Sequence, residues 1–361
     1  MFFYFQPVYL EQLGADPVMI GMVLGAAGIV MTVAHIPAGI LSDKIGRKPL
    51  LLTSWSIGMV ATWIMASAKN LPVFIMGILI YSISAFVMSP LNSYITAARG
   101  KLKVERVLTI INASYSAGAI VGPYLGGLIG GRLGLRSIYQ VSGFIFIIST
   151  LIIFFIHPQA VEQHSSSEVK NKLQLDKRFS IYLVIVFIAM FATYLPQPLT
   201  AIFLQDHRGI TVEQLGTLGS ITSGGIVILN LALGSIPVQI SFILAQGCVA
   251  LFALFIWQGN SLPLYFLGYF LMGGSRAARI LATAQTRKLV HQANMGLAYG
   301  ITETVGTSAV ILAPPIAGYL YDYRPTLPYS LSIILITFSL IASWVYNQSH
   351  LSQVSDVIES Q

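Results

Sequence analysis

The chain has 361 residues, of which 55% are hydrophobic and only 9% are charged. A soluble domain carries about 25% charged residues, so this composition excludes an ordinary soluble protein, and the mean hydropathy of +0.76 agrees. The formal charge of +7 could indicate a nucleic-acid partner, which the placement of the basic residues argues against below. The single cysteine, Cys248, excludes a disulfide framework or a cysteine metal site within one chain.

Long apolar runs alternate with short polar breaks from one end of the chain to the other. A membrane-spanning helix needs about 20 mostly apolar residues. The runs are continuous, which favours helices over a barrel, because backbone groups in lipid must be paired within their own segment. We therefore predict an all-α polytopic membrane protein. Its eleven expected spans are 17–40, 49–68, 71–97, 107–131, 137–156, 179–204, 215–234, 236–258, 262–286, 294–321 and 327–346.

Two segments need separate treatment. The stretch from Gln214 to Ser275 has no charge and is long enough for more than two spans, so a tight Gly/Pro turn must divide it, and we place this break at Gly234–Pro237. Residues 1–10 are apolar but reach only about 15 Å as a helix, half the thickness of the hydrocarbon core. They lack the basic leader and cleavage site of a secretory signal. We interpret them as the outer half of a truncated first helix.

The basic residues gather in alternate loops. If the loop before Pro17 is external, the internal loops hold thirteen basic residues and the external loops five. The internal set is Lys44, Arg47, Lys48, Arg99, Lys101, Lys103, Arg106, Lys170, Lys172, Lys177, Arg178, Arg287 and Lys288, and the external set is Lys69, Arg132, Arg136, Arg208 and Arg324. This is the positive-inside bias of cytoplasmic loops, and it explains the net charge without a nucleic acid. We expect a multi-pass protein of the cell (plasma) membrane.

The two halves of the chain repeat one another. Leu71, Pro72, Gly77 and Pro123 recur at an offset of 191, as Leu262, Pro263, Gly268 and Pro314, and earlier glycines recur at an offset of 195. With that second offset, the first helix would begin about 16 residues before Met1. Two six-helix halves with a site near the midplane are an architecture of secondary transporters. The predicted domains are an N-terminal helix bundle at 1–157, a cytoplasmic linker at 158–177, a C-terminal bundle at 178–348 and a cytoplasmic tail at 349–361.

A basic turn with fixed glycine and aspartate positions separates the first two full spans. It reads Gly39-x-Leu-Ser-Asp43-x-x-Gly46-Arg47-Lys48. It resembles the loop pattern Gly-x-Leu-Ala-Asp-Arg-x-Gly-Arg-Lys of the major facilitator superfamily. The resemblance implies a twelve-helix fold of two pseudo-symmetric bundles. It also implies that these residues form a conformational latch, in which Asp43 faces a helix of the second half near Asn294. A plain basic turn would explain the Lys and Arg but not the spacing of Gly and Asp.

A second motif lies in the span at 107–131 and reads Gly118-x-x-x-Gly122-Pro123-x-x-Gly126-Gly127. It resembles the fifth-helix motif of antiporters in the same superfamily, with Thr109 at the position of an earlier family glycine. Generic helix packing explains the small residues equally well. An Arg-x-x-Gln-Gly element of the family's fourth helix is missing, since its Arg position falls near Ile78, and this puts proton antiport in doubt.

Four ionisable residues lie inside the predicted spans, where charges cost several kcal/mol unless they are paired or wetted. They are His35, Arg276, Arg279 and Glu303. Arg279 and Glu303 lie about 12 and 13.5 Å from the inner ends of neighbouring helices, so the two side chains could meet. One interpretation makes Glu303 a proton or cation acceptor, and the other makes the pair a static lock. His35, near the cytoplasmic end, is either a proton relay or a loop contact.

Further polar and aromatic residues are candidates for lining a cavity: Asn92, Asn112, Tyr115, Gln197, Asn230, Gln285 and Tyr299. The chain has no phosphate-binding loop, no Ser-His-Asp arrangement and no cluster of metal ligands, so we expect neither an enzyme nor a cofactor or metal. We predict a secondary transporter of a small solute, a monomer that works by alternating access. Export is the favoured direction, and protons are a candidate coupling ion. Uptake of a nutrient or metabolite, and a non-transporting receptor or inactive fragment, stay open as alternatives.

Overall fold

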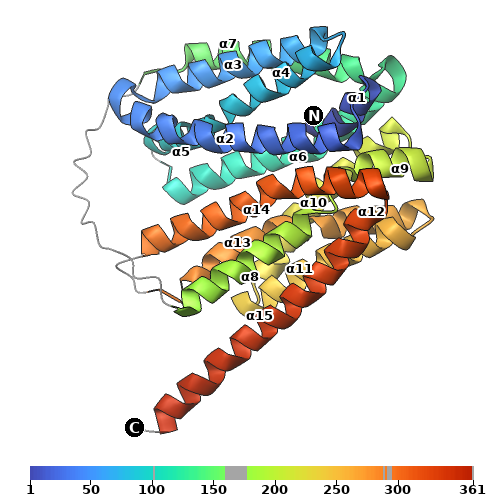
Figure 1. The fold of residues 1–361 in the computed structure, drawn as a ribbon. Helices are drawn as coiled ribbons and strands as arrows, with labels where there is room; N and C mark the ends of the chain where they lie inside the picture. Colours follow the sequence, from blue (N-terminus) through green and yellow to red (C-terminus); the bar gives the residue numbers. More distant parts are fainter. Residues whose placement is uncertain (101, 159–176, 288, 291–294, 360–361) are drawn as a thin grey trace. The chain divides into compact units, whose positions relative to one another are not determined.

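The computed structural model describes residues 1–100, 102–158, 177–287, 289–290 and 295–359 (Figure 1). Side chains are described for these residues except 36–44, 89, 105 and 349–359. The described residues are helical with short connections and contain no strand. This agrees with the all-α class that the continuous apolar runs predict. The predicted linker at 158–177 falls almost wholly outside the described residues.

The chain forms two compact units, Met1–Glu168 with Gly209–Ser220, and Val169–Arg208 with Ile221–Gln361. The first unit holds η1 (Phe3–Phe5), α1 (Gln6–Gln12), α2 (Pro17–Ile45), α3 (Arg47–Ser67), α4 (Leu71–Ile83), η2 (Ser84–Val87), α5 (Met88–Ala97), α6 (Val104–Leu133) and α7 (Leu135–Phe155). The second holds α8 (Lys177–Tyr194), α9 (Thr200–Arg208), α11 (Val238–Gln258), α12 (Leu262–Met272), α13 (Gly274–Thr286), α14 (Met295–Tyr323) and α15 (Leu327–Glu359). Helix α10 (Val212–Gly234) begins in the first unit and continues in the second.

Nine helical segments of the described chain are long and apolar enough to cross a membrane. Two of the eleven predicted spans do not meet that measure. The span at 107–131 lies in α6, a 30-residue helix rich in glycine, and the span at 262–286 is divided between α12 and α13. The predicted break at Gly234–Pro237 is confirmed, because α10 ends at Gly234 and α11 begins at Val238.

The predicted continuous span at 179–204 is wrong in detail. Helix α8 ends at Tyr194 and α9 begins at Thr200. Pro196 and Pro198 lie in the gap. Proline has no backbone N–H and its ring clashes with the preceding turn, so two prolines so close together stop the helix. The apolar composition alone could not reveal this interruption, because proline does not lower hydropathy enough to break the run.

Helix starts follow the sequence closely in the first unit. The Asp16 side chain accepts a hydrogen bond from the Met19 amide (2.7 Å) at the start of α2, and Asn70 accepts one from the Val73 amide (3.2 Å) at the start of α4. Both residues satisfy backbone donors that have no partner within the helix. Gly46, between α2 and α3, has φ +82°, a conformation that strongly favours glycine. These signals turn the chain sharply at both ends of α2.

The break between α12 and α13 coincides with close backbone contacts in the second unit. A Cβ atom on Gly273 would lie 2.5 Å from the Ile226 amide nitrogen of α10, and a Cβ on Gly225 would overlap the Phe270 carbonyl oxygen. A Cβ on Gly274 would lie 2.7 Å from the Ala245 carbonyl oxygen of α11. Glycine at these positions lets three helices touch backbone to backbone. The break fixes where the polar face of α13 begins.

Candidate solute-binding and coupling site

Helix α13 is amphipathic, although it continues an apolar helix. Its buried face carries small or aliphatic side chains such as Ala277, Ala278 and Leu281, which pack in the core of the second unit. On its other faces Arg276 is exposed and Arg279 is half-buried. Arg276 lies 14 residues after the start of α12 and 10 before the end of α13, which are about 21 and 15 Å of helix. It therefore lies near the middle of the predicted span at 262–286.

Arg279 and Glu303 form an ion pair between α13 and α14. The Arg279 Nε and Nη2 atoms both donate to Glu303 Oε2, at 3.1 and 3.0 Å. Thr283 Oγ1 donates to Glu303 Oε1 (2.7 Å), and Arg279 Nη2 also donates to Thr307 Oγ1 (2.7 Å). We call these four residues the charged cluster. The meeting of Arg279 and Glu303, which their depths in the sequence predicted, is present in the structure.

Both carboxylate oxygens of Glu303 accept hydrogen bonds in the charged cluster. Glu303 accepts three hydrogen bonds, two of them from a guanidinium, and such charge-assisted bonds are about twice as strong as neutral ones. The Arg279 and Glu303 side chains keep 29% and 44% of their exposure, so the cluster is not sealed in the core. Small and apolar residues of α8, α13 and α14 border it, among them Met190, Ala282 and Gly306. The arrangement can hold the two helices together, and it can also release a carboxylate to solvent.

Thr283 and Thr307 are functional candidates that the sequence analysis missed. Thr283 lies four residues after Arg279, and Thr307 lies four residues after Glu303. Residues four apart share a helix face, so a search for hydroxyls at this spacing from the two charges would have found both. They complete the bonding of the pair without adding charge.

Further along α13, the polar side chains of Gln285 and Thr286 are buried in the packing of the second unit. Gln285 is 4% exposed and its Nε2 donates to Asn347 Oδ1 (3.1 Å). Thr286 and Thr302 share a hydrogen bond of 2.9 Å, and the Tyr182 hydroxyl donates to the Ala282 carbonyl oxygen (2.6 Å). Gln285, a candidate cavity residue by sequence, therefore lies inside the packing of the second unit.

The other candidate cavity residues divide between the units. In the first, Asn92, Asn112 and Tyr115 are exposed, and Asn112 donates to the Leu108 carbonyl oxygen of its own helix (2.9 Å). In the second, Gln197 donates to the Thr193 carbonyl oxygen (2.6 Å), and Asn230 and Tyr299 are half-buried. Their role as a shared lining stays a prediction.

The loop motif is described only in part. Its Gly46 is buried at the turn, and Arg47 and Lys48, both half-buried, begin α3. The side chains at Gly39 and Asp43, and the expected partner near Asn294, lie outside the described side chains. His35 is exposed on α2. The latch therefore stays a prediction, whereas the need for glycine at position 46 follows from its φ.

The glycines of the fifth-helix motif differ from one another within the first unit. A Cβ on Gly127 would lie 2.9 Å from the Gly216 Cα, and a Cβ on Gly126 would lie 2.8 Å from the Phe5 ring. A Cβ on Gly122 would lie 3.2 Å from the Met1 nitrogen, whereas one on Gly118 meets nothing within 4 Å. Pro123 lies within α6. Close packing accounts for Gly126 and Gly127, and it does not account for Gly118.

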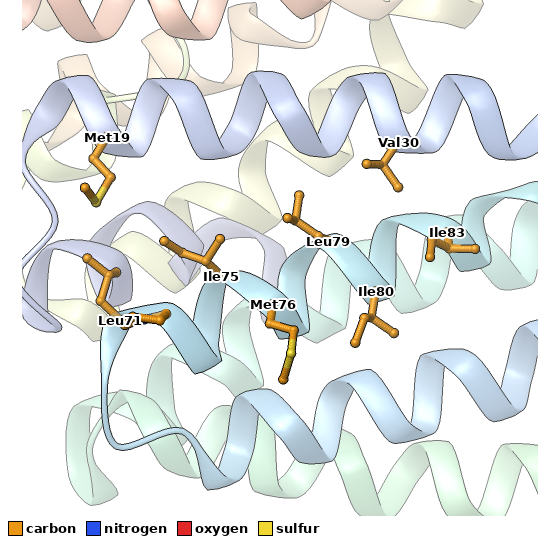
Figure 2. Close-up of a pocket in the computed structure, with 9 residues that line it drawn as sticks. Met19, Val30, Leu71, Ile75, Met76, Leu79, Ile80 and Ile83 are labelled. Atoms are coloured by element: carbon orange, nitrogen blue, oxygen red, sulfur yellow. The ribbon is translucent and has the colours of Figure 1, made fainter.

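An apolar groove of about 520 Å³ lies between α2 and α4 in the first unit (Figure 2). Met19 and Val30 reach into it from α2, and a row of α4 side chains that includes Ile75, Leu79 and Ile83 forms its other wall. Its lining has no charged or hydroxyl side chain. The groove can accept an alkyl chain, but it has no group that could orient a polar solute.

Comparison with known proteins agrees with this architecture. The family model described as Major Facilitator Superfamily matches residues 1–237. An uncharacterized MFS-type transporter of Methanocaldococcus jannaschii is 28% identical over 180 residues, or 48% of this chain and 45% of that protein. The multi-drug resistance efflux pump PmrA of Streptococcus pneumoniae is 26% identical over 232 residues, or 61% of this chain and 57% of that protein. These two matches thus span about half of the length of the relatives.

Among solved structures, a crystal structure of a variant of the nucleoside transporter NupG matches with a TM-score of 0.79 at 16% sequence identity, covering 96% of this chain and 95% of that one. At this identity the likeness concerns the fold alone. The family match covers well over half of the chain, and the helices follow the fold that the Gly39–Lys48 loop implies. The chain belongs to the Major Facilitator Superfamily and has the helices of a multi-pass membrane protein.

Proposed function

We propose that this protein is a secondary transporter that exports a small solute across the plasma membrane by alternating access. The observation that carries the proposal is the charged cluster with Arg276 beside it, on an amphipathic helix in the middle of a span. Polar groups at that depth are costly unless water or a solute reaches them, so they indicate a solute pathway. The match to a protein named as an efflux pump supports export.

The charged cluster suits a lock between α13 and α14 in this proposal. Glu303 has its charge balanced by Arg279 and both of its oxygens bonded, so in this arrangement it does not attract a cationic solute. The Gly39–Lys48 loop supplies the predicted latch, and the protein acts as a monomer. A monoanion that leaves a cell with an interior-negative potential gains about 2.3 kcal/mol per 100 mV, so export of an anion needs no coupling ion.

Proton-coupled antiport is a second candidate, favoured by the 44% exposure of the Glu303 side chain. Release of Glu303 from Arg279 would free a carboxylate to take up a proton from solvent. The Gly118–Gly127 motif supports the same candidate, and the missing arginine near Ile78 weighs against it. Uptake of a nutrient or metabolite by the same fold is the alternative in direction.

Counterflow in proteoliposomes tests the proposal. Solutes are first selected by their effect on thermal unfolding of the full chain, and vesicles are loaded with the unlabelled solute and diluted into its labelled form. We expect transient, saturable accumulation of label, and faster exit when the protein's cytoplasmic face bears the solute. An imposed pH gradient that changes the rate of the wild type but not of Glu303→Gln identifies proton coupling. Absence of counterflow for every stabilising solute would refute transport.

A further inference from the structure

Arg276 has no acidic partner in the part of the chain whose side chains are described. The ion pair found there joins Arg279 to Glu303, one turn away, and Arg276 is not part of it. Of the acidic residues in the described part of the second unit, Asp206 and Asp322 lie near the ends of α9 and α14. Only Glu303 lies deep in a span, and Arg279 already balances it. The described side chains of the second unit therefore carry one net positive charge at mid-depth.

A cation at this depth must be wetted or paired, because an isolated charge in hydrocarbon costs several kcal/mol. Arg276 lies on the exposed side of α13, away from the buried Ala277, Ala278 and Leu281. It thus does not pack in the core of its own unit, and the cost of a charge in hydrocarbon favours a position that water or a solute reaches. A lock between two helices would need only Arg279 and Glu303, so the second arginine has no structural use in the charged cluster.

We propose that Arg276 binds the carboxylate or phosphate group of an anionic solute, so that this transporter carries organic anions. A guanidinium presents a planar fork of donors that matches both groups in two-point contact. A cationic solute would need a free carboxylate, but Glu303 is already paired with Arg279, and the positive charge of Arg276 would repel the solute. This inference rests on the proposed function, because it names the solute class of the same site.

The test measures binding by the full chain in phosphatidylcholine nanodiscs, through the shift of the thermal unfolding midpoint. The anionic probes are benzoate, phthalate and phenyl phosphate, and the matched probes are benzylamine and benzyl alcohol. We expect at least one anion to raise the midpoint in a saturable way while the amine and the alcohol do not. Arg276→Gln should weaken the apparent affinity for that anion at least tenfold, and Arg276→Lys should restore part of it.

The matched control is Arg287→Gln, which removes an exposed arginine of the same helix region near its cytoplasmic end and should leave the affinity within twofold. Equal stabilisation by benzylamine, an unchanged anion affinity in Arg276→Gln, or no effect of any anion would each overturn the proposal. Stabilisation only by added phosphatidylglycerol would show a lipid headgroup as the anion and would overturn it as well. If counterflow occurs with a neutral or cationic solute, transport stands and only this inference fails.

Discussion

The same helix pattern carries different chemistry in the two halves of the chain. An offset of 191 aligns α13 and α14 with α5 and α6, together with the turn before α5. At this register, Arg276, Arg279, Thr283 and Glu303 fall on Ala85, Met88, Asn92 and Asn112. The first half thus has neutral residues at all four of these positions. The fold does not require charges at these positions, so the charged cluster and Arg276 are additions that need a separate explanation.

The corresponding helix breaks, between α4 and α5 in the first half and between α12 and α13 in the second, also differ. In the first half, α4 passes through the short η2 turn into α5, and the Ser84 carbonyl oxygen there accepts a hydrogen bond from Ser54 Oγ (2.7 Å). In the second half, the equivalent break lies at Gly273 and Gly274. There the backbone of α10 packs against Gly273 and the backbone of α11 packs against Gly274. Both halves interrupt the helix at similar depth, by different means. An interrupted helix exposes polar groups within a span, which suits a solute pathway.

The largest effect is expected from filling the close contact in the second half. Gly225→Leu places side-chain atoms where the Phe270 carbonyl oxygen lies, so α10 and α12 must separate. We expect a loss of about 3 kcal/mol of folding free energy or more, seen as loss of monodisperse protein in detergent. The control is Gly224→Leu on the same helix, where a Cβ meets nothing within 4 Å. Equal behaviour of the two variants would contradict the account of the break.

Arg279→Gln tests whether the charges of the second half support its structure. The change leaves Glu303 without its cation while Thr283 still donates to it. Because both side chains keep part of their exposure, we expect a loss of about 2 kcal/mol, smaller than for a fully buried pair. Thermal unfolding in nanodiscs measures it. Met88→Gln, at the equivalent register of the first half, should cost less, and a larger loss there would reverse the comparison.

Asp43→Asn tests the predicted latch of the first half; the corresponding break of the second half, at Gly234–Pro237, carries no Asp, Lys or Arg. We expect transport to slow about tenfold, or ~1.4 kcal/mol in activation free energy, while solute affinity changes little. The reason is that a latch acts on the conformational step and not on the solute site. Counterflow and thermal-shift titration of the same preparation separate the two effects, with Ser42→Ala as the control. Normal transport by Asp43→Asn would remove the latch from the account.

The smallest effect is expected at the rim of the charged cluster. Thr307→Val removes the hydroxyl that accepts a hydrogen bond from Arg279 Nη2 and keeps the shape of the side chain. We expect a loss of about 1 kcal/mol, the usual net value of one hydrogen bond. Ser308→Ala on the same helix, whose hydroxyl only bonds back to the Thr304 carbonyl oxygen, should cost less. If Ser308→Ala costs more, Arg279 does not depend on Thr307.

Several features could be predicted from sequence because their signals are local or periodic. The long apolar runs gave the helices and the fold class, the Gly39–Lys48 loop gave the family, and distance along two helices brought Arg279 to Glu303. The interruption at Pro196 has a local signal, a pair of nearby prolines, which the apolar composition of the run hides. The contact of Gly225 with Phe270 could not be predicted in the same way, because it depends on where a second helix packs, and a list of glycines does not say which of them face another backbone. The partners Thr283 and Thr307 were within reach through helical spacing.

The most direct test of the central claim, that Arg279 and Glu303 act as a neutral pair in transport, is a double-mutant cycle measured by counterflow. We predict that Arg279→Gln and Glu303→Gln each slow counterflow at least tenfold, because each leaves an unbalanced charge at mid-depth. The double variant should recover at least half of that loss on a logarithmic scale, since it resembles the neutral register of α5 and α6. A double variant as slow as the product of the single effects, or a Glu303→Gln variant with normal counterflow, would contradict the claim.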